Sequence, residues 1–137
     1  IMQGPPDVIE LFHGYTYSGH PLACAAGIAT LDVYKEQGLF ERAAELTPYL
    51  EKAVHSLARH DVVQDVRNFG MVAAVDLKPR EGAPTARSFE TYLKAFEQGV
   101  LVRTTGDIIA MSPPLIVDEK QIDTIINTLD DILSSLE

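Results

Sequence analysis

Apolar residues recur every three or four positions in the first half of the chain, which predicts two consecutive helices. The first helix begins at Pro21, because proline suits the opening turn of a helix, and ends near Gly38. The second helix covers residues 39–60, and Pro48 is expected to kink it or split it in two. Residues 1–17 carry no such period and are expected to be irregular.

The second half of the chain alternates between short strand-like runs and two further helices. The expected elements are strands at 62–67 and 71–77 with a turn at 68–70, a helix around 89–96 that Gly99 ends, strands at 100–103 and 108–111 around a turn at 104–107, and a last helix that Asp118 caps. Short antiparallel strands joined to helices favour an α+β, two-layer domain with the helices packed on one face of the sheet.

Composition narrows the class of protein. The chain has 137 residues, is 46% hydrophobic and has a formal net charge of -9, with eleven Lys and Arg against twenty Asp and Glu. It is too apolar for a disordered chain, and its acidity argues against nucleic acid as a partner. No apolar run reaches the roughly 20 residues that span a bilayer, so no membrane partner is expected. A single cysteine fits a reducing cytoplasm.

The segment from His13 to Pro21 is the first candidate site. It places the hydroxyls of Tyr15, Thr16 and Ser18 just before the start of a helix, where unpaired backbone N–H groups attract anions. One interpretation is a phosphate or carboxylate contact through Thr16 or Ser18. The other is a glycine-bearing helix start capped by these hydroxyls, which the residues alone favour because such caps are common.

Arg103 is the second candidate, at the end of an apolar strand and before a Gly-Asp turn. Its guanidinium could grip a carboxylate with two hydrogen bonds. The alternative, which spacing alone favours, is an ion pair with Asp107 across its own hairpin.

The histidines, the cysteine and the aspartates near the C-terminus give only weak indications of a functional site. His13 and His20 are seven positions apart, which does not match the spacing of a helical zinc pair, so each is expected to be a hydrogen-bonded structural side chain and no metal site is expected. Cys24 lies on an alanine-rich helix face and is expected to be buried and inert. Asp130 and Asp131 suggest no chemistry.

Three stretches together resemble the class III pyridoxal-phosphate-dependent aminotransferases. They are residues 13–26 (HGYTYSGHPLACAA), residues 67–71 (RNFGM), and Val102-Arg103 followed by Gly106-Asp107 and Ser112-Pro113-Pro114-Leu115. The likeness runs from about Phe12 to the C-terminus. The HGYTYSGHP form is most similar to the branch that moves amino groups between ω-amino acids, such as β-alanine, and pyruvate.

The resemblance implies roles for the candidate residues. Tyr15 and Thr16 match positions that contact the phosphate of the cofactor, pyridoxal 5'-phosphate, in the opposite subunit of a homodimer, and Arg103 matches the arginine that binds the substrate carboxylate. It also implies the fold of the small domain of the PLP-dependent transferases. Residues 1–20 would be a crossover segment from a large domain, and residues 21–137 the C-terminal small domain.

The same resemblance implies that the reacting lysine lies upstream of this sequence. None of Lys35, Lys52, Lys78, Lys94 and Lys120 stands in the family's lysine motif. We therefore expect a fragment that has no catalytic residue of its own, that binds no cofactor alone, and that acts with its own large domain and a second subunit. Two alternatives remain open: a free-standing α+β module that binds small acids through Arg103, and a structural interaction domain whose apolar helix at 22–33 packs on another domain or chain.

Overall fold

The computed structural model describes residues 15–136, and the chain divides into two units, Ile1–Gln37 and Gly38–Glu137. His13, Gly14 and the rest of the expected irregular segment up to residue 14 lie outside the described residues. The predicted boundary at residue 20 stays a prediction.

The described part of the first unit is a turn followed by helix α1, Pro21–Glu36. Pro21 opens this helix as predicted, and Gly38, with φ of +57°, follows its last turn. No residue of α1 is buried, so Cys24 is exposed and its predicted burial is wrong. The alanine-rich face that suggests burial has no described neighbour to cover it.

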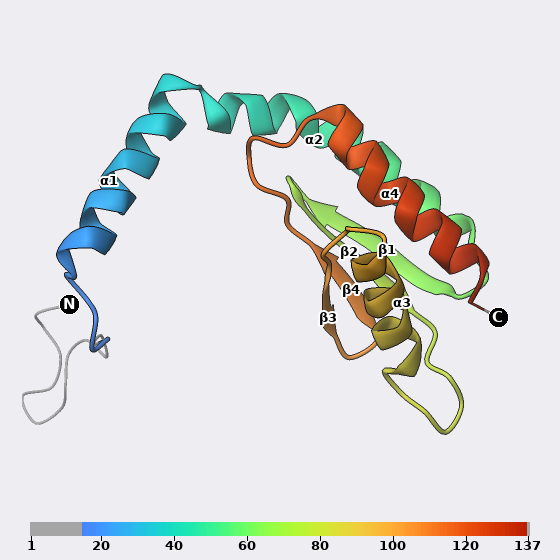
Figure 1. The fold of residues 1–137 in the computed structure, drawn as a ribbon. Helices are drawn as coiled ribbons and strands as arrows, with labels where there is room; N and C mark the ends of the chain where they lie inside the picture. Colours follow the sequence, from blue (N-terminus) through green and yellow to red (C-terminus); the bar gives the residue numbers. More distant parts are fainter. Residues whose placement is uncertain (1–14, 137) are drawn as a thin grey trace, which may run out of the picture. The chain divides into compact units, whose positions relative to one another are not determined.

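The second unit contains the remaining elements (Figure 1). They are α2 (Leu39–His55), the 3-10 helix η1 (Ser56–Arg59), β1 (Val63–Phe69), β2 (Val72–Leu77), α3 (Ala86–Glu97), β3 (Arg103–Thr105), β4 (Ile108–Met111) and α4 (Glu119–Ser134). None of the helices in the part of the chain that the structure describes is long and apolar enough to cross a membrane.

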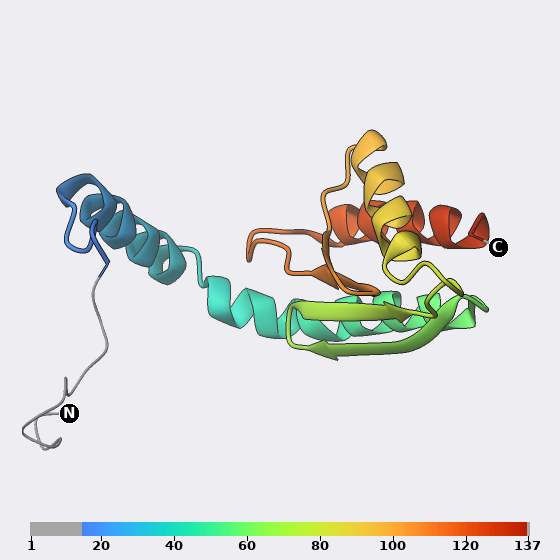
Figure 2. The same cartoon turned by 90° about the horizontal axis from the view of Figure 1, so that it is seen from below.

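The four strands form one antiparallel sheet in the order β1-β2-β4-β3, so β1 and β3 are its edges. Val66 pairs with Val75, and Val75 pairs with Ile109, which places these apolar side chains in one row on one face of the sheet. All three are buried. The helices cover this face, with α2 against β1 and β2 and α3 against β3 and β4 (Figure 2). The predicted α+β, two-layer arrangement is confirmed.

Helix α4 closes the core by packing against α2 and α3. Its apolar stripe matches the predicted period, and its buried members are Ile122, Ile126, Leu129, Ile132 and Leu133; Leu136, just beyond the end of the helix, is buried as well. Asp118 caps the helix as predicted: its side chain accepts a hydrogen bond from the backbone of Gln121, and the Gln121 side chain accepts one in return from the backbone of Asp118.

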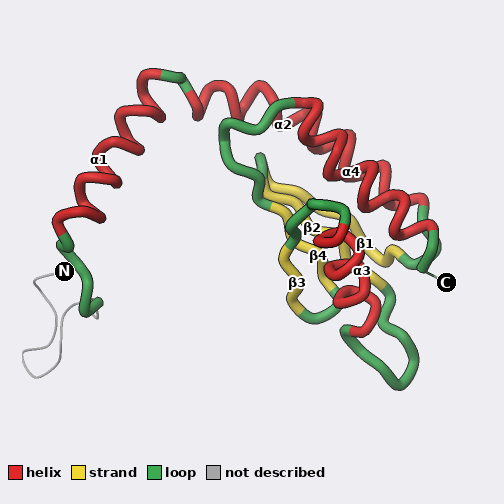
Figure 3. The backbone as a smooth tube through the Cα atoms, in the orientation of Figure 1, coloured by secondary structure: helices red, strands yellow, loops and turns green. Residues whose placement is uncertain are grey.

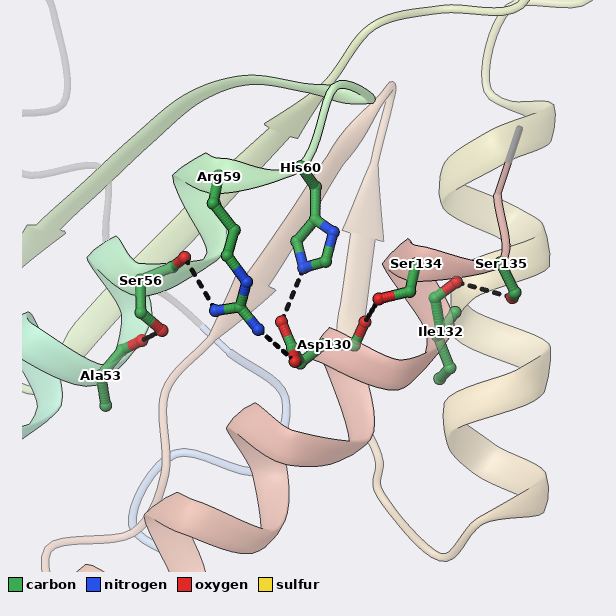
Figure 4. Close-up of polar contacts among 8 residues, drawn as sticks. All are labelled: Ala53, Ser56, Arg59, His60, Asp130, Ile132, Ser134 and Ser135. Atoms are coloured by element: carbon green, nitrogen blue, oxygen red, sulfur yellow. Dashed lines mark hydrogen bonds and ion pairs between the residues drawn. The ribbon is translucent and has the colours of Figure 1, made fainter.

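Asp130 ties the C-terminal half of α4 to the segment that follows α2 (Figure 4). Its Oδ1 lies 2.6 Å from His60 Nε2, and its Oδ2 forms an ion pair with Arg59. The Arg59 guanidinium also donates to the carbonyl of Ser56. The carboxylate that suggests no function in the sequence therefore joins two elements 70 residues apart.

Pro48 does not split the second helix, because α2 runs through it without a break, whereas the predicted kink stays a prediction. Two other local predictions are wrong. The first hairpin turn is shorter than predicted, because Asn68 and Phe69 belong to β1. The strand predicted at 100–103 begins only at Arg103 and continues to Thr105, because Val100 and Val102 are buried in the core without pairing in the sheet.

Candidate functional site

Arg103 lies on the uncovered face of the sheet, on the edge strand β3. It pairs with Ala110 of β4, Ala110 pairs with Ala74 of β2, and Ala74 pairs with Arg67 of β1. Because directly paired residues share a face, this row carries two arginines separated by two alanines. The small methyl side chains between them leave the surface around the Arg103 guanidinium open to a ligand.

The two arginines of this row differ in their partners. Arg67 Nη1 lies 2.8 Å from Asp76 Oδ1 and 3.2 Å from Asp65 Oδ2, and these carboxylates, Asp76 above all, raise the pKa of Arg67. Arg103 forms no ion pair with any residue that the structure describes. Of the two arginines in this row, Arg103 is therefore the one whose positive charge is not neutralised by a neighbouring carboxylate.

The alternative partner of Arg103, Asp107, is engaged elsewhere. Its Oδ1 accepts a hydrogen bond of 2.9 Å from the backbone N–H of Thr85, at the start of α3. The ion pair between Arg103 and Asp107 that the spacing favours is therefore absent from the described residues, and that interpretation is wrong. An exposed guanidinium without an internal partner is suited to an external carboxylate.

Arg103 also lines a cavity of about 690 Å3 at the edge of the sheet. The wall combines apolar side chains with a few polar ones: Tyr92, Leu101, Val102, Arg103, Thr104, Ala110, Met111, Ser112, Pro113, Pro114, Val117, Gln121 and Ile125. Such a lining can hold a carboxylate at the guanidinium and a short carbon chain against the apolar wall. All of these residues belong to the second unit, so this cavity is formed within residues 38–137.

Part of the wall is the loop between β4 and α4, drawn in green in Figure 3. Within this loop the Val117 N–H donates to the Pro114 carbonyl at 2.9 Å, which forms a tight turn. From outside, Arg42 of α2 donates its Nη1 to the Leu115 carbonyl at 3.0 Å. No pattern in the sequence indicates Arg42, because this contact joins residues 73 positions apart.

The first unit holds the other candidate residues, Tyr15 and Thr16. They lie in a turn in which Ser18 N–H donates to the Tyr15 carbonyl and His20 N–H to the Tyr17 carbonyl. The helix α1 that follows has no side-chain cap at His20, so the interpretation of this segment as a hydroxyl-capped helix start is wrong. Thr16 and Ser18 are exposed, and their hydroxyls form no hydrogen bond within the described part of the chain.

The five lysines are not among the residues that line the cavity of Arg103. Four of the five are exposed, and Lys94 is half-buried, with its Nζ 2.8 Å from Glu90 Oε1. Two histidines are engaged in hydrogen bonds, His55 with Asn68 and His60 with Asp130, whereas His20 contacts the edge of the Tyr17 ring. Residues 15–136 contain no group of three or more metal-ligating side chains.

Comparison with known proteins decides the family. A family model described as Aminotransferase class-III matches residues 2–133. The chain belongs to the class III aminotransferases. Members of this family depend on pyridoxal phosphate.

Two curated relatives show how this class III aminotransferase chain compares in length. It is 54% identical to an omega-aminotransferase of Caulobacter vibrioides over 137 residues, which is 100% of this chain and 31% of the relative. It is 39% identical to a beta-alanine–pyruvate aminotransferase of Pseudomonas aeruginosa over 132 residues, which is 96% of this chain and 30% of that protein. The chain thus spans less than a third of the length of these relatives.

Solved structures agree with this family. The chain resembles a thermostable omega transaminase variant from Pseudomonas jessenii, with a TM-score of 0.82 and 31% identity over 93% of this chain and 30% of the other. It also resembles the omega transaminase of the same organism in complex with PMP, with a TM-score of 0.79 and 31% identity over 92% of this chain and 30% of that one.

Proposed function

We propose that this chain is the C-terminal part of an aminotransferase that moves an amino group from an ω-amino acid, such as β-alanine, to pyruvate. The observation that carries this proposal is the exposed Arg103, which has no ion-pair partner among the described residues and lines a cavity with an apolar wall. Both β-alanine and pyruvate carry a carboxylate, which suits the guanidinium of Arg103, on a short carbon skeleton, which suits the apolar wall. The name of the Pseudomonas aeruginosa relative, a beta-alanine–pyruvate aminotransferase, and that of the Caulobacter vibrioides relative, an omega-aminotransferase, support this reaction class.

In this scheme Arg103 binds the substrate carboxylate and orients the substrate. Its planar guanidinium holds the carboxylate of the donor, and then that of the acceptor, by two parallel hydrogen bonds. This orients the terminal amine of the ω-amino acid, and then the keto carbon next to the carboxylate of pyruvate, for reaction. The apolar wall restricts water around the carbon chain. Pyridoxal phosphate, when bound, supplies the electron sink that lets an amino group leave one molecule for another.

Two residues of this chain are suited to bind the phosphate group of that cofactor. The exposed hydroxyl of Thr16, in a turn just before the N-terminus of α1, is chemically suited to a phosphate, with Tyr15 beside it. We assign these two residues to the cofactor phosphate of a second subunit, which requires a homodimer. As the resemblance to the family implies, a reacting lysine would come from polypeptide outside this sequence, and no lysine of this chain lines the cavity of Arg103. We place the enzyme in the cytoplasm, in keeping with its single free cysteine.

The test compares Arg103→Gln with Arg67→Gln in the protein translated from the complete reading frame that contains this sequence. Arg67 is the matched control, because it lies in the same row of the sheet but is neutralised by Asp76 and Asp65. We expect Arg103→Gln to raise KM for pyruvate about 10- to 100-fold, since it removes a charged hydrogen-bonding pair. Arg67→Gln should change KM less than about threefold.

Two results would count against this function. One is a wild-type protein that transfers no amino group from β-alanine to pyruvate in the presence of pyridoxal phosphate. The other is an Arg103→Gln variant with the same KM as wild type. If the 137-residue chain bound pyruvate by calorimetry while the complete protein was inactive, the small-acid-binding module would be favoured instead.

A further inference from the structure

Arg42 of α2 contacts the loop between β4 and α4. Its guanidinium donates to the Leu115 carbonyl at 3.0 Å, and its side chain is half-buried. Arg42 does not line the cavity of Arg103. It lines a separate, polar hollow of about 530 Å3, together with residues that include Glu45 and Lys120. Any effect of Arg42 on the cavity must therefore pass through the loop.

The loop makes few other hydrogen bonds, although Val117 at its end is buried in the core. Pro113 and Pro114 carry no backbone N–H, so they cannot donate to a neighbouring strand. Inside the loop, which the structure describes in full, there is a single hydrogen bond, between Val117 and Pro114, and its far end is fixed by the capping box of α4. Within the described residues, Arg42 supplies the one side-chain hydrogen bond that this loop receives.

The same loop forms a wall of the candidate carboxylate site. Ser112, Pro113 and Pro114 line the cavity with Arg103, and Leu115, the residue that Arg42 holds, follows them directly. A shift of the loop would therefore move the wall against which a ligand held by Arg103 must pack. Because a hydrogen bond from a charged donor is stronger than a neutral one, Arg42 is well suited to fix this position.

We propose that Arg42 is a positioning residue for carboxylate binding, and that it acts by anchoring the loop 112–117 against α2. This inference rests on the proposed function of Arg103. Arg42 has no contact with substrate in this scheme. It determines how closely the Ser112-Pro113-Pro114 wall approaches a carboxylate that the Arg103 guanidinium holds.

The experiment measures loop dynamics and acceptor preference in the complete protein. In Arg42→Gln we expect faster hydrogen exchange at the amides of Leu115, Ile116 and Val117. KM for pyruvate should rise about fivefold with kcat within about twofold, and KM for propanal, an acceptor that lacks the carboxylate, should be unchanged. Arg42→Lys keeps a charged donor and should recover part of the pyruvate KM.

Arg87→Gln is the matched control, because Arg87 is also half-buried and also donates to a backbone carbonyl, that of Lys78, but lies away from the cavity. It should leave exchange in the loop and the preference for pyruvate over propanal unchanged. The inference is overturned if exchange in the loop is the same in Arg42→Gln and wild type, or if KM for pyruvate and propanal rises equally. A failure of the proposed function is seen separately, in the wild-type protein and in Arg103→Gln.

Discussion

A polar side chain in this chain is expected to stabilise the fold more when it joins elements that are distant in sequence. Asp130 has both carboxylate oxygens engaged, one by His60 and one by Arg59, across 70 positions of sequence. His60 is only 11% exposed, so its hydrogen bond is protected from solvent, whereas Arg59 is 56% exposed. The His60 contact is therefore expected to contribute more of the stability of this junction.

We expect Asp130→Ala to lower the free energy of unfolding by about 1–2 kcal/mol, because it leaves the His60 ring nitrogen without its acceptor. Urea denaturation followed by circular dichroism measures this change. Asp131→Ala is the control: Asp131 is exposed and lies near the C-terminal end of α4, where a negative charge is unfavourable. Equal losses in the two variants would show that the junction contributes nothing specific.

Glu90 gives a prediction about pH. Hydrogen bonds from Lys94 and Arg80 hold the pKa of this carboxyl below its ordinary value. A depressed pKa in the folded state adds stability that is fully present above the ordinary glutamate pKa of about 4.3 and is lost as pH falls through the lower, folded value. We expect Glu90→Gln to cost about 0.5 kcal/mol at pH 7, because the cluster is one-third exposed.

The cost of Glu90→Gln should shrink toward zero as the pH is lowered below about 4, as measured by urea denaturation at several pH values. Glu97→Gln is the control for the change of charge, since Glu97 is exposed on the same helix and forms no ion pair with another described residue. A difference between Glu90→Gln and wild type that stayed constant down to about pH 3 would contradict the assigned cause.

At the scale of elements, the sequence predicts the apolar period of a helix well and the pairing of strands poorly. The stripe of α4 from Ile122 to Leu133 is predictable because five apolar positions follow the helical period and all are buried in the core. Val100 and Val102 also look like a strand, but they are buried while running from α3 to β3 without a strand partner. Alternation of apolar and polar residues indicates that one side of a segment is buried, but it does not by itself indicate that the segment pairs with another strand.

Helix α3 shows the limit of apolar patterning. The helix is predicted from Phe89, Leu93 and Phe96, which are 56%, 44% and 61% exposed, whereas Ser88 and Thr91 are buried. The buried hydroxyls have partners, since Ser88 Oγ lies 2.7 Å from the Gly106 carbonyl oxygen and Thr91 Oγ1 donates to the Arg87 carbonyl. The Thr91 bond is local to the helix, whereas the contact of Ser88 with Gly106, like that of Arg42 with Leu115, depends on tertiary structure and leaves no local pattern.

Pro48 gives a test at the same scale. The helix α2 continues through it, although proline cannot donate the hydrogen bond that this position would make to the carbonyl of Ala44. We expect Pro48→Ala to stabilise the fold by about 1 kcal/mol, the recovered helix propensity being partly offset by a more flexible unfolded chain. Ala44→Ser, one turn earlier and exposed, is the control. A destabilised Pro48→Ala variant, measured by thermal unfolding, would contradict this.

At the scale of the whole molecule, the core lies in one unit. Every member of the buried cluster, from Leu50 to Leu136, belongs to residues 38–137, and α1 contributes none. The candidate site residues divide in the same way, with Tyr15 and Thr16 in the first unit and Arg103 in the second. The resemblance of the sequence to class III aminotransferases indicates the family and these three residues, whereas Arg42 is found only from the structure.

We therefore expect residues 38–137, expressed alone, to unfold cooperatively, with a Tm within about 3 °C of that of the 137-residue chain. Differential scanning calorimetry of both proteins measures this. The chain with Val75→Asp, at a fully buried strand position, is the control that should lose the transition. A gradual, non-cooperative transition of residues 38–137 would show that the first 37 residues are needed for the core.

The short hairpin between β3 and β4 decides which way Arg103 points. Thr105 pairs with Ile108 across Gly106-Asp107, and this two-residue connection fixes the register in which Arg103 stands opposite Ala110. One extra residue at that connection, if it shifted the ladder by one position, would turn the guanidinium toward the helices and present Thr104 outward. Under the proposed function, the length of this surface turn therefore governs whether Arg103 can reach a carboxylate, so an insertion there would abolish acid binding without altering any residue of the cavity wall.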